Sequence, residues 1–197
     1  MIAPGTGLGE GFLIWDGERY QPHPSEGGHT SFGPETSLQL ELLNHMDDIY
    51  HHVSYERVCS GLGIANLYNF LKEVKGLDEP DWLHEQLQEA QDPTPIIAEV
   101  ALKGEAEICV QTMDLFVSIL GSEAGNLALT LLATGGIYLA GGIPRRIMPL
   151  LRGDPFKQGF LDKGRFAGML TRVPVYVITH PHAGVFGAAC HGLQNMS

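Results

Sequence analysis

The alternation of apolar and polar positions predicts that the chain begins with strands. Met1–Pro4 has the character of a strand end, and Gly9–Trp15 has that of the next strand. Asp16-Gly17 then supplies a two-residue hairpin signal, so the chain is expected to return through Arg19–Gln21. The first strands should therefore be antiparallel, with the glycine loop Gly5–Gly9 separating the first two.

Beyond this region the apolar spacing changes to that of a helix. Leu38, Leu42 and Met46 recur at every fourth position, which predicts an amphipathic helix. Thr36 or Ser37 is placed to cap its N-terminus, because a hydroxyl there can accept a hydrogen bond from a free backbone N–H. The chain therefore changes from strand to helix near residue 36.

Three more helical stretches are predicted in the middle of the chain. One extends over 63–75 and ends at Gly76, and a solvated helical segment is expected within the polar, acidic stretch 77–95. Residues 106–132 carry the longest apolar stripe and should form the central helix. Gly121 and Gly125 interrupt this stripe, which would let another backbone approach closely.

The last third of the chain is expected to return to the sheet. Gly136–Ala140 has the pattern of a short buried strand, and Pro144 is placed to start the following helix. Val173–Thr179 is rich in β-branched residues and predicts another strand. Ala183–Leu193 is expected to form a helix of small residues packed against that strand.

Composition indicates one globular unit, either a domain or a large lobe. Apolar residues make up 44% of the 197 positions and charged residues only 18%, which is typical of an ordinary packed interior. The net charge of −11 argues against a nucleic-acid or anionic-membrane partner, because phosphate backbones attract a basic face. If the protein binds phosphate, its backbone N–H groups should supply most of the donors.

Cysteine and histidine placement predicts neither a disulfide framework nor a metal centre. The three cysteines are far apart in sequence and form no CxxC pair, which is most simply explained by a reducing cytoplasm. No Cys or carboxylate completes a ligand set with His51-His52 or with His180 and His182, so no metal ligands are assigned. The uncharged stretch 127–143 is interpreted as a helix end, a turn and a strand, because it is too short for a membrane span.

Gly5-Thr6-Gly7-Leu8-Gly9 is a candidate phosphate-binding loop. It lacks the Lys-Ser/Thr ending of a Walker loop, and the hairpin signal that follows excludes the helix of a dinucleotide fingerprint. What remains is a loop between two strands, in which Gly5, Gly7 and Gly9 expose backbone N–H groups and Thr6 adds a hydroxyl. A tight glycine turn without a ligand is the alternative.

A second cluster has the chemistry needed to bind a sugar. Glu26 and His29 flank a glycine pair that permits a sharp turn, and Glu56 follows later in Ser54-Tyr55-Glu56-Arg57. A carboxylate can accept hydrogen bonds from two neighbouring hydroxyls, and an imidazole adds another donor or acceptor. Ordinary surface roles for these residues are the alternative, since isolated charged side chains are usually solvated.

The third cluster is a strand that ends in glycines at a helix start. Gly141, Gly142 and Ile143 lie in Leu139–Pro144, where the expected strand gives way to a helix. Open α/β sheets bind ligands beyond the carboxyl ends of their strands, and glycine lets a flat ring or a ribose approach the backbone. A plain strand-to-helix turn is the alternative here.

The three clusters, in this order, resemble the bacterial glucokinase family over nearly the whole chain. The resemblance implies an α/β fold of the actin-like ATPase or ribonuclease H-like class, with a mixed sheet that begins with antiparallel strands. Gly5, Thr6, Gly7 and Gly9 are similar to its second phosphate loop, and Gly141, Gly142 and Ile143 to its adenosine-binding segment. Glu26, His29 and Glu56 match its glucose-binding residues.

The family's activity is transfer of a phosphoryl group from ATP, with Mg²⁺, to the 6-hydroxyl of glucose, and a homodimer is implied. The DxGGT-type first phosphate loop and the catalytic aspartate of the family's smaller lobe have no counterpart here. Residues 1–197 are therefore expected to be the C-terminal large domain without the N-terminal small domain, with no catalytic residue and no activity alone. The alternative hypothesis is a sugar-responsive regulator or a non-catalytic actin-like binding module.

Overall fold

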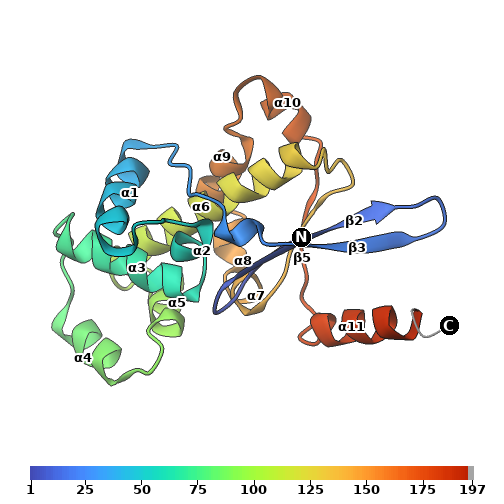
Figure 1. Ribbon diagram of the computed structural model, residues 1–197. Coiled ribbons are helices and arrows are strands. Elements are labelled where there is room, and N and C mark those ends of the chain that lie inside the picture. Colours follow the sequence, from blue (N-terminus) through green and yellow to red (C-terminus); the bar gives the residue numbers. More distant parts are fainter. Residues whose placement is uncertain (195–197) are drawn as a thin grey trace.

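The computed structural model describes residues 1–194 and contains a five-stranded mixed sheet in the order β3-β2-β1-β4-β5 (Figure 1). Its strands are β1 (Ile2–Pro4), β2 (Leu8–Trp15), β3 (Tyr20–Ser25), β4 (Ile137–Leu139) and β5 (Val175–Val177). β1, β2 and β3 pair antiparallel, whereas β4 pairs parallel to both β1 and β5. This arrangement confirms the predicted mixed sheet with an antiparallel beginning.

The hairpin between β2 and β3 forms at the predicted position. Asp16 Oδ1 accepts hydrogen bonds from the backbone N–H groups of Glu18 (2.9 Å) and Arg19 (2.8 Å), and its Oδ2 accepts one from Gln21 Nε2 (2.7 Å). These bonds, led by that from the Arg19 backbone, hold the pKa of the Asp16 carboxyl well below its usual value. The hairpin tip extends away from the helices (Figure 1).

Helices occupy most of the remaining chain. They are η1 (Gly27–His29), α1 (Ser37–Tyr50), α2 (Tyr55–Val58), α3 (Gly61–Glu73), α4 (Asp81–Glu89), α5 (Thr94–Lys103), α6 (Glu107–Thr130), α7 (Gly142–Arg146), α8 (Met148–Leu151), α9 (Asp154–Leu161), η2 (Gly164–Phe166), α10 (Ala167–Leu170) and α11 (Ala183–Gln194). The helices predicted after residue 36, over 63–75, within 77–95 and over 106–132 correspond to α1, α3, α4 and α6. The stretch 127–143 contains the end of α6 and strand β4, and no helix within residues 1–194 is long and apolar enough to cross a membrane.

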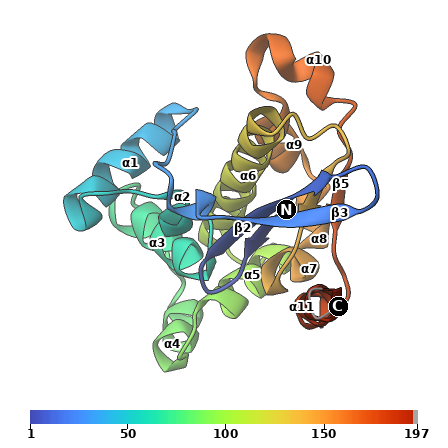
Figure 2. The same ribbon diagram turned by 45° about the vertical axis from the view of Figure 1, so that its right-hand side comes forward.

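α6 is the central helix and is buried on most sides. Phe116, Ile119 and Leu120 are fully buried, and α9 lies alongside this helix (Figure 2). A Cβ on Gly121 would overlap the Phe156 carbonyl oxygen, and one on Gly125 would lie 2.7 Å from that of Phe160. The predicted close backbone approach is therefore confirmed, and its partner is α9.

The N-cap of α1 is Thr36, whose Oγ1 accepts a hydrogen bond from Gln39 N at 3.2 Å. We expect Thr36→Ala to lower the free energy of unfolding by about 1 kcal/mol, because this N–H loses its side-chain acceptor. Urea denaturation of the chain measures the change. Thr36→Ser retains the hydroxyl and should stay close to the wild type, so an equal loss in both variants would show that the cap does not stabilise α1.

The predicted packing of the last helix is wrong. α11 covers the expected residues, but Val185, Phe186 and Leu193 are 71%, 60% and 72% exposed, and the helix lies apart from the sheet in both views (Figures 1 and 2). Its small residues permit close packing without specifying a partner. Within residues 1–194, no atom outside the adjacent residues and the backbone of the same helix lies within 4 Å of a Cβ placed on Gly184 or Gly187.

Candidate functional site

The glycine loop connects β1 to β2, as predicted, and is held from two sides. Gly5 N donates to Gly7 O at 2.8 Å, so this N–H already has a partner within the loop. Gly61 N, at the start of α3, donates to Gly5 O at 2.7 Å. Thr6 is exposed at the turn. The loop therefore lies between two strands as predicted, but its Gly5 N–H is not free for a phosphate, and its phosphate-binding role stays a prediction.

Glu56 lies against this loop, a contact that sequence reasoning did not anticipate. It stands in the first turn of α2, and its Oε2 accepts a hydrogen bond from Leu8 N at 2.9 Å. A Cβ on Gly7 would overlap the same oxygen, so glycine is what lets the carboxylate come so close. The Glu56 carboxylate therefore connects α2 to the start of β2.

Glu26 immediately precedes the short turn η1 and His29 ends it, with both side chains exposed. His29 N donates to Glu26 O at 3.0 Å, which closes the turn. A Cβ on Gly28 would overlap the Leu8 carbonyl oxygen, so this turn packs directly on β2. The turn is also joined to α2, because Tyr55 N donates to Thr30 O at 3.0 Å.

Leu8 is the point at which the two predicted sugar-binding elements meet. Its N–H binds the Glu56 carboxylate, and its carbonyl supports Gly28 in the turn that carries Glu26 and His29. The structure thus brings these elements to the same strand, directly after the glycine loop.

The third predicted cluster lies beside the beginning of the glycine loop. Gly141 has φ of 91°, a left-handed conformation that favours glycine, and a Cβ there would lie 2.7 Å from the Pro4 carbonyl oxygen. Ala140 N donates to Ile2 O at 2.9 Å, which continues the parallel pairing of β1 and β4. Gly142 and Ile143 then begin α7. The two segments predicted to bind nucleotide are therefore adjacent at the carboxyl ends of two parallel strands.

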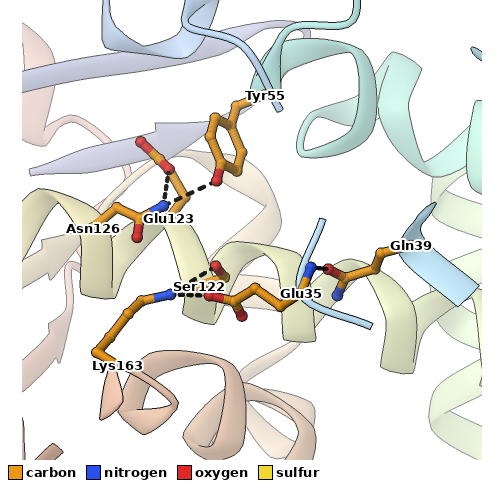
Figure 3. Close-up of polar contacts among 7 residues, drawn as sticks. All are labelled: Glu35, Gln39, Tyr55, Ser122, Glu123, Asn126 and Lys163. Atoms are coloured by element: carbon orange, nitrogen blue, oxygen red, sulfur yellow. Dashed lines mark hydrogen bonds and ion pairs between the residues drawn. The ribbon is translucent and has the colours of Figure 1, made fainter. Parts of the chain in front are cut away.

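A buried polar network lies under the turn, and the sequence analysis did not identify it. Asn126 Nδ2 donates to Tyr55 Oη (2.9 Å) and to Glu123 Oε2 (3.0 Å) (Figure 3). Glu10 and Glu123 are close enough for their carboxyls to interact. Burial raises the pKa of Glu123 to about 7, and burial likewise raises the pKa of Glu10.

A second polar contact fixes the segment that leads into α1. Lys163 Nζ donates to Ser122 Oγ at 3.0 Å and forms an ion pair with Glu35, whose N–H donates to Gln39 Oε1 at 2.8 Å (Figure 3). The Lys163 side chain is only 8% exposed. This contact fastens residues after the turn to α6.

Comparison with known proteins identifies the family. The sequence profile of the family described as Glucokinase matches residues 1–195. The chain belongs to the glucokinase family. It is 43% identical to the glucokinase of Nostoc punctiforme over 201 aligned residues, which cover 96% of this chain and 59% of that protein. The chain thus spans less than two thirds of the length of this relative.

Solved structures agree with this assignment. A glucokinase from an Antarctic psychrotroph superposes with a TM-score of 0.81 at 35% identity, covering 95% of this chain and 55% of that one. The glucokinase from Balamuthia mandrillaris, solved in complex with glucose, has a TM-score of 0.75 at 23% identity and covers 91% and 49%. The predicted actin-like ATPase fold class is therefore confirmed.

Proposed function

We propose that this chain is the glucose- and ATP-binding lobe of a glucokinase, which transfers the terminal phosphoryl group of MgATP to the 6-hydroxyl of glucose. The junction at Leu8 carries the proposal, because one residue contacts both the Glu56 carboxylate and the turn of Glu26 and His29, directly after the glycine loop. Membership of the glucokinase family supports the same assignment.

In this proposal the ligands are divided between the two halves of the site. Glu26, His29 and Glu56 bind the sugar, since carboxylate and imidazole groups pair with hydroxyls. Gly5–Gly9 binds the ATP phosphates, and Gly141–Ile143 supports the adenosine. With a net charge of −11, the chain relies on backbone N–H groups for the phosphates, and Mg²⁺ enters as part of the substrate.

Phosphoryl transfer depends mainly on positioning and charge stabilisation, which this lobe supplies by holding two substrates on adjoining elements. We propose that residues 1–197 correspond to the family's large domain and that the base which takes the sugar proton lies outside them. The chain alone is then expected to bind ligands without turnover. We also propose a cytoplasmic homodimer as its functional state.

Isothermal titration calorimetry with glucose and with MgATP, together with a coupled phosphorylation assay, tests this function. The proposal expects binding of both ligands and no turnover. Absence of glucose binding would contradict the sugar-binding role, and robust glucose phosphorylation by the chain alone would contradict the placement of the base.

We expect Glu56→Gln to weaken glucose binding about tenfold, because a charged acceptor is worth more to a hydroxyl than a neutral one. The glutamine carbonyl can still accept the hydrogen bond from Leu8 N, so the fold of the loop should persist. Glu89→Gln, an exposed change on α4, is the matched control and should bind like the wild type. Equal affinity in the two variants would remove Glu56 from the sugar site.

A further inference from the structure

Two buried carboxyl groups from distant parts of the chain interact beneath the turn η1, where Glu10 Oε2 lies against Gly27. Glu10 belongs to β2 and Glu123 to α6, and Glu123 is only 6% exposed. Glu10 Oε1 is buried and receives no hydrogen bond from any donor in residues 1–194. Two charged carboxylates cannot donate to each other, so a hydrogen bond between this pair requires one of them to be protonated.

The surroundings favour a proton as the group that neutralises the pair. The ion pairs of Lys72, Lys75, His84 and Lys103 involve other carboxylates, and Lys163 is held by Glu35 and Ser122. On the α2 side stand Tyr55 and Cys59, whose pKa values are raised by burial and by Glu123, so both stay neutral. The Met1 amino group is a positive charge that acts on Glu10, but burial lowers its pKa, so it offsets less of the charge of the pair as the pH rises.

The pair directly supports the turn that carries the predicted sugar ligands. A Cβ on Gly27 would overlap Glu10 Oε2, so the carboxyl lies immediately beneath the turn backbone. On the other side, Glu123 accepts from Asn126, which also donates to Tyr55, and the Tyr55 N–H binds Thr30 O at the end of the turn. A continuous set of contacts therefore leads from the carboxyl pair to both sides of Glu26 and His29.

We propose that Glu10 and Glu123 share one proton and act as positioning residues, holding the Ser25–Thr30 turn in the conformation that binds the sugar. Loss of this proton places two like charges in contact behind the turn, so the turn loosens and sugar affinity falls. The sugar part of this inference rests on the proposed function, whereas the effect on the turn does not.

Amide hydrogen exchange of the full chain, corrected for the intrinsic effect of pH, measures the turn directly. We expect protection of the Gly27–Thr30 amides to fall about tenfold between about pH 6 and about pH 8. Glucose affinity, measured by calorimetry over the same range, is expected to fall in parallel. A purely structural role of these residues would not produce this dependence on pH.

Glu123→Gln is the informative variant, because its amide can donate to Glu10 at every pH while its carbonyl still accepts from Asn126. Its turn protection and its glucose affinity should be the same at both pH values. If Glu123→Gln fails to fold, Glu10→Gln removes the other carboxyl of the pair and makes the same test. Glu18→Gln, at an exposed position on the hairpin, is the control and should show the same pH dependence as the wild type.

The outcomes separate this inference from the proposed function. The shared proton would be contradicted if the hydrogen-exchange protection of the turn amides in the wild type did not change with pH. It would also be contradicted if a glutamine variant showed the same pH dependence as the wild type. A pH-dependent turn without glucose binding at any pH would support the shared proton and contradict the proposed function instead.

Discussion

Gly121→Ala is expected to lower the free energy of unfolding by about 3 kcal/mol, although alanine is the better helix former. The new methyl group would overlap the Phe156 carbonyl oxygen and lie 3.0 Å from its carbonyl carbon and 3.1 Å from Phe160 N. These are backbone atoms, so no side chain can rotate away. α9 must therefore move off α6, which loosens the packing of Phe156 and Phe160, each only 5% exposed.

Gly168→Ala in α10 is the matched control, because a Cβ there would meet no atom within 4 Å outside the adjacent residues and the backbone of its own helix. It should leave the protein as stable as the wild type or stabilise it by up to about 1 kcal/mol. Gly159→Ala inserts a methyl group at the same interface from α9, against the Ser118 carbonyl oxygen, and should resemble Gly121→Ala. Urea denaturation compares the three. If Gly121→Ala matched Gly168→Ala, the close α6–α9 approach would not contribute to stability.

The features predicted correctly from the sequence depend on local chemistry or on strict periodicity. Asp16-Gly17 specifies its hairpin through hydrogen bonds within five residues, and the Thr36 cap acts on the neighbouring Gln39. The glycines of α6 indicated a close backbone approach because only the absence of a side chain permits one. The identity of the approaching helix could not be predicted, since it depends on the path of the chain after β4.

The packing of α11, in contrast, could not be predicted from local chemistry. The helix covers the expected residues, so its position in the sequence was predictable. Where a helix packs depends on complementary surfaces elsewhere, and a run of small residues fits many surfaces. Val185 and Phe186 remain exposed for this reason rather than through an error in assigning the helix.

The candidate site likewise contains residues that the sequence predicted and residues that it did not. The Glu26–His29 turn and Glu56 were selected by their chemistry, and the structure brings their elements together at Leu8. Glu10 and Glu123 were not selected, because each belongs to a regular element and only the folded chain brings their carboxyls close together. The binding roles themselves stay predictions.

The Glu10–Glu123 pair should also make stability depend on pH in a direction opposite to that of ordinary ion-paired carboxylates. An unfolded glutamate titrates near 4.5, whereas burial raises the pKa of folded Glu123 to about 7. The folded protein therefore keeps a proton that the unfolded chain releases. The resulting stabilisation is complete below about pH 4.5 and is lost as the pH rises through about 7.

We expect the free energy of unfolding of the wild type to fall by about 3 kcal/mol between about pH 5 and about pH 8, relative to the double variant Glu10→Gln, Glu123→Gln. Two glutamine amides can hydrogen-bond to each other without a titrating proton, so the variant should not show this fall in stability. Subtracting its curve removes the titration of groups that do not interact with the pair. Urea denaturation across this range gives both curves. Glu85→Gln, an exposed change on α4, should run parallel to the wild type. If the double variant also ran parallel to the wild type, the two carboxyls would titrate as ordinary surface groups, and a shared proton could not support the turn.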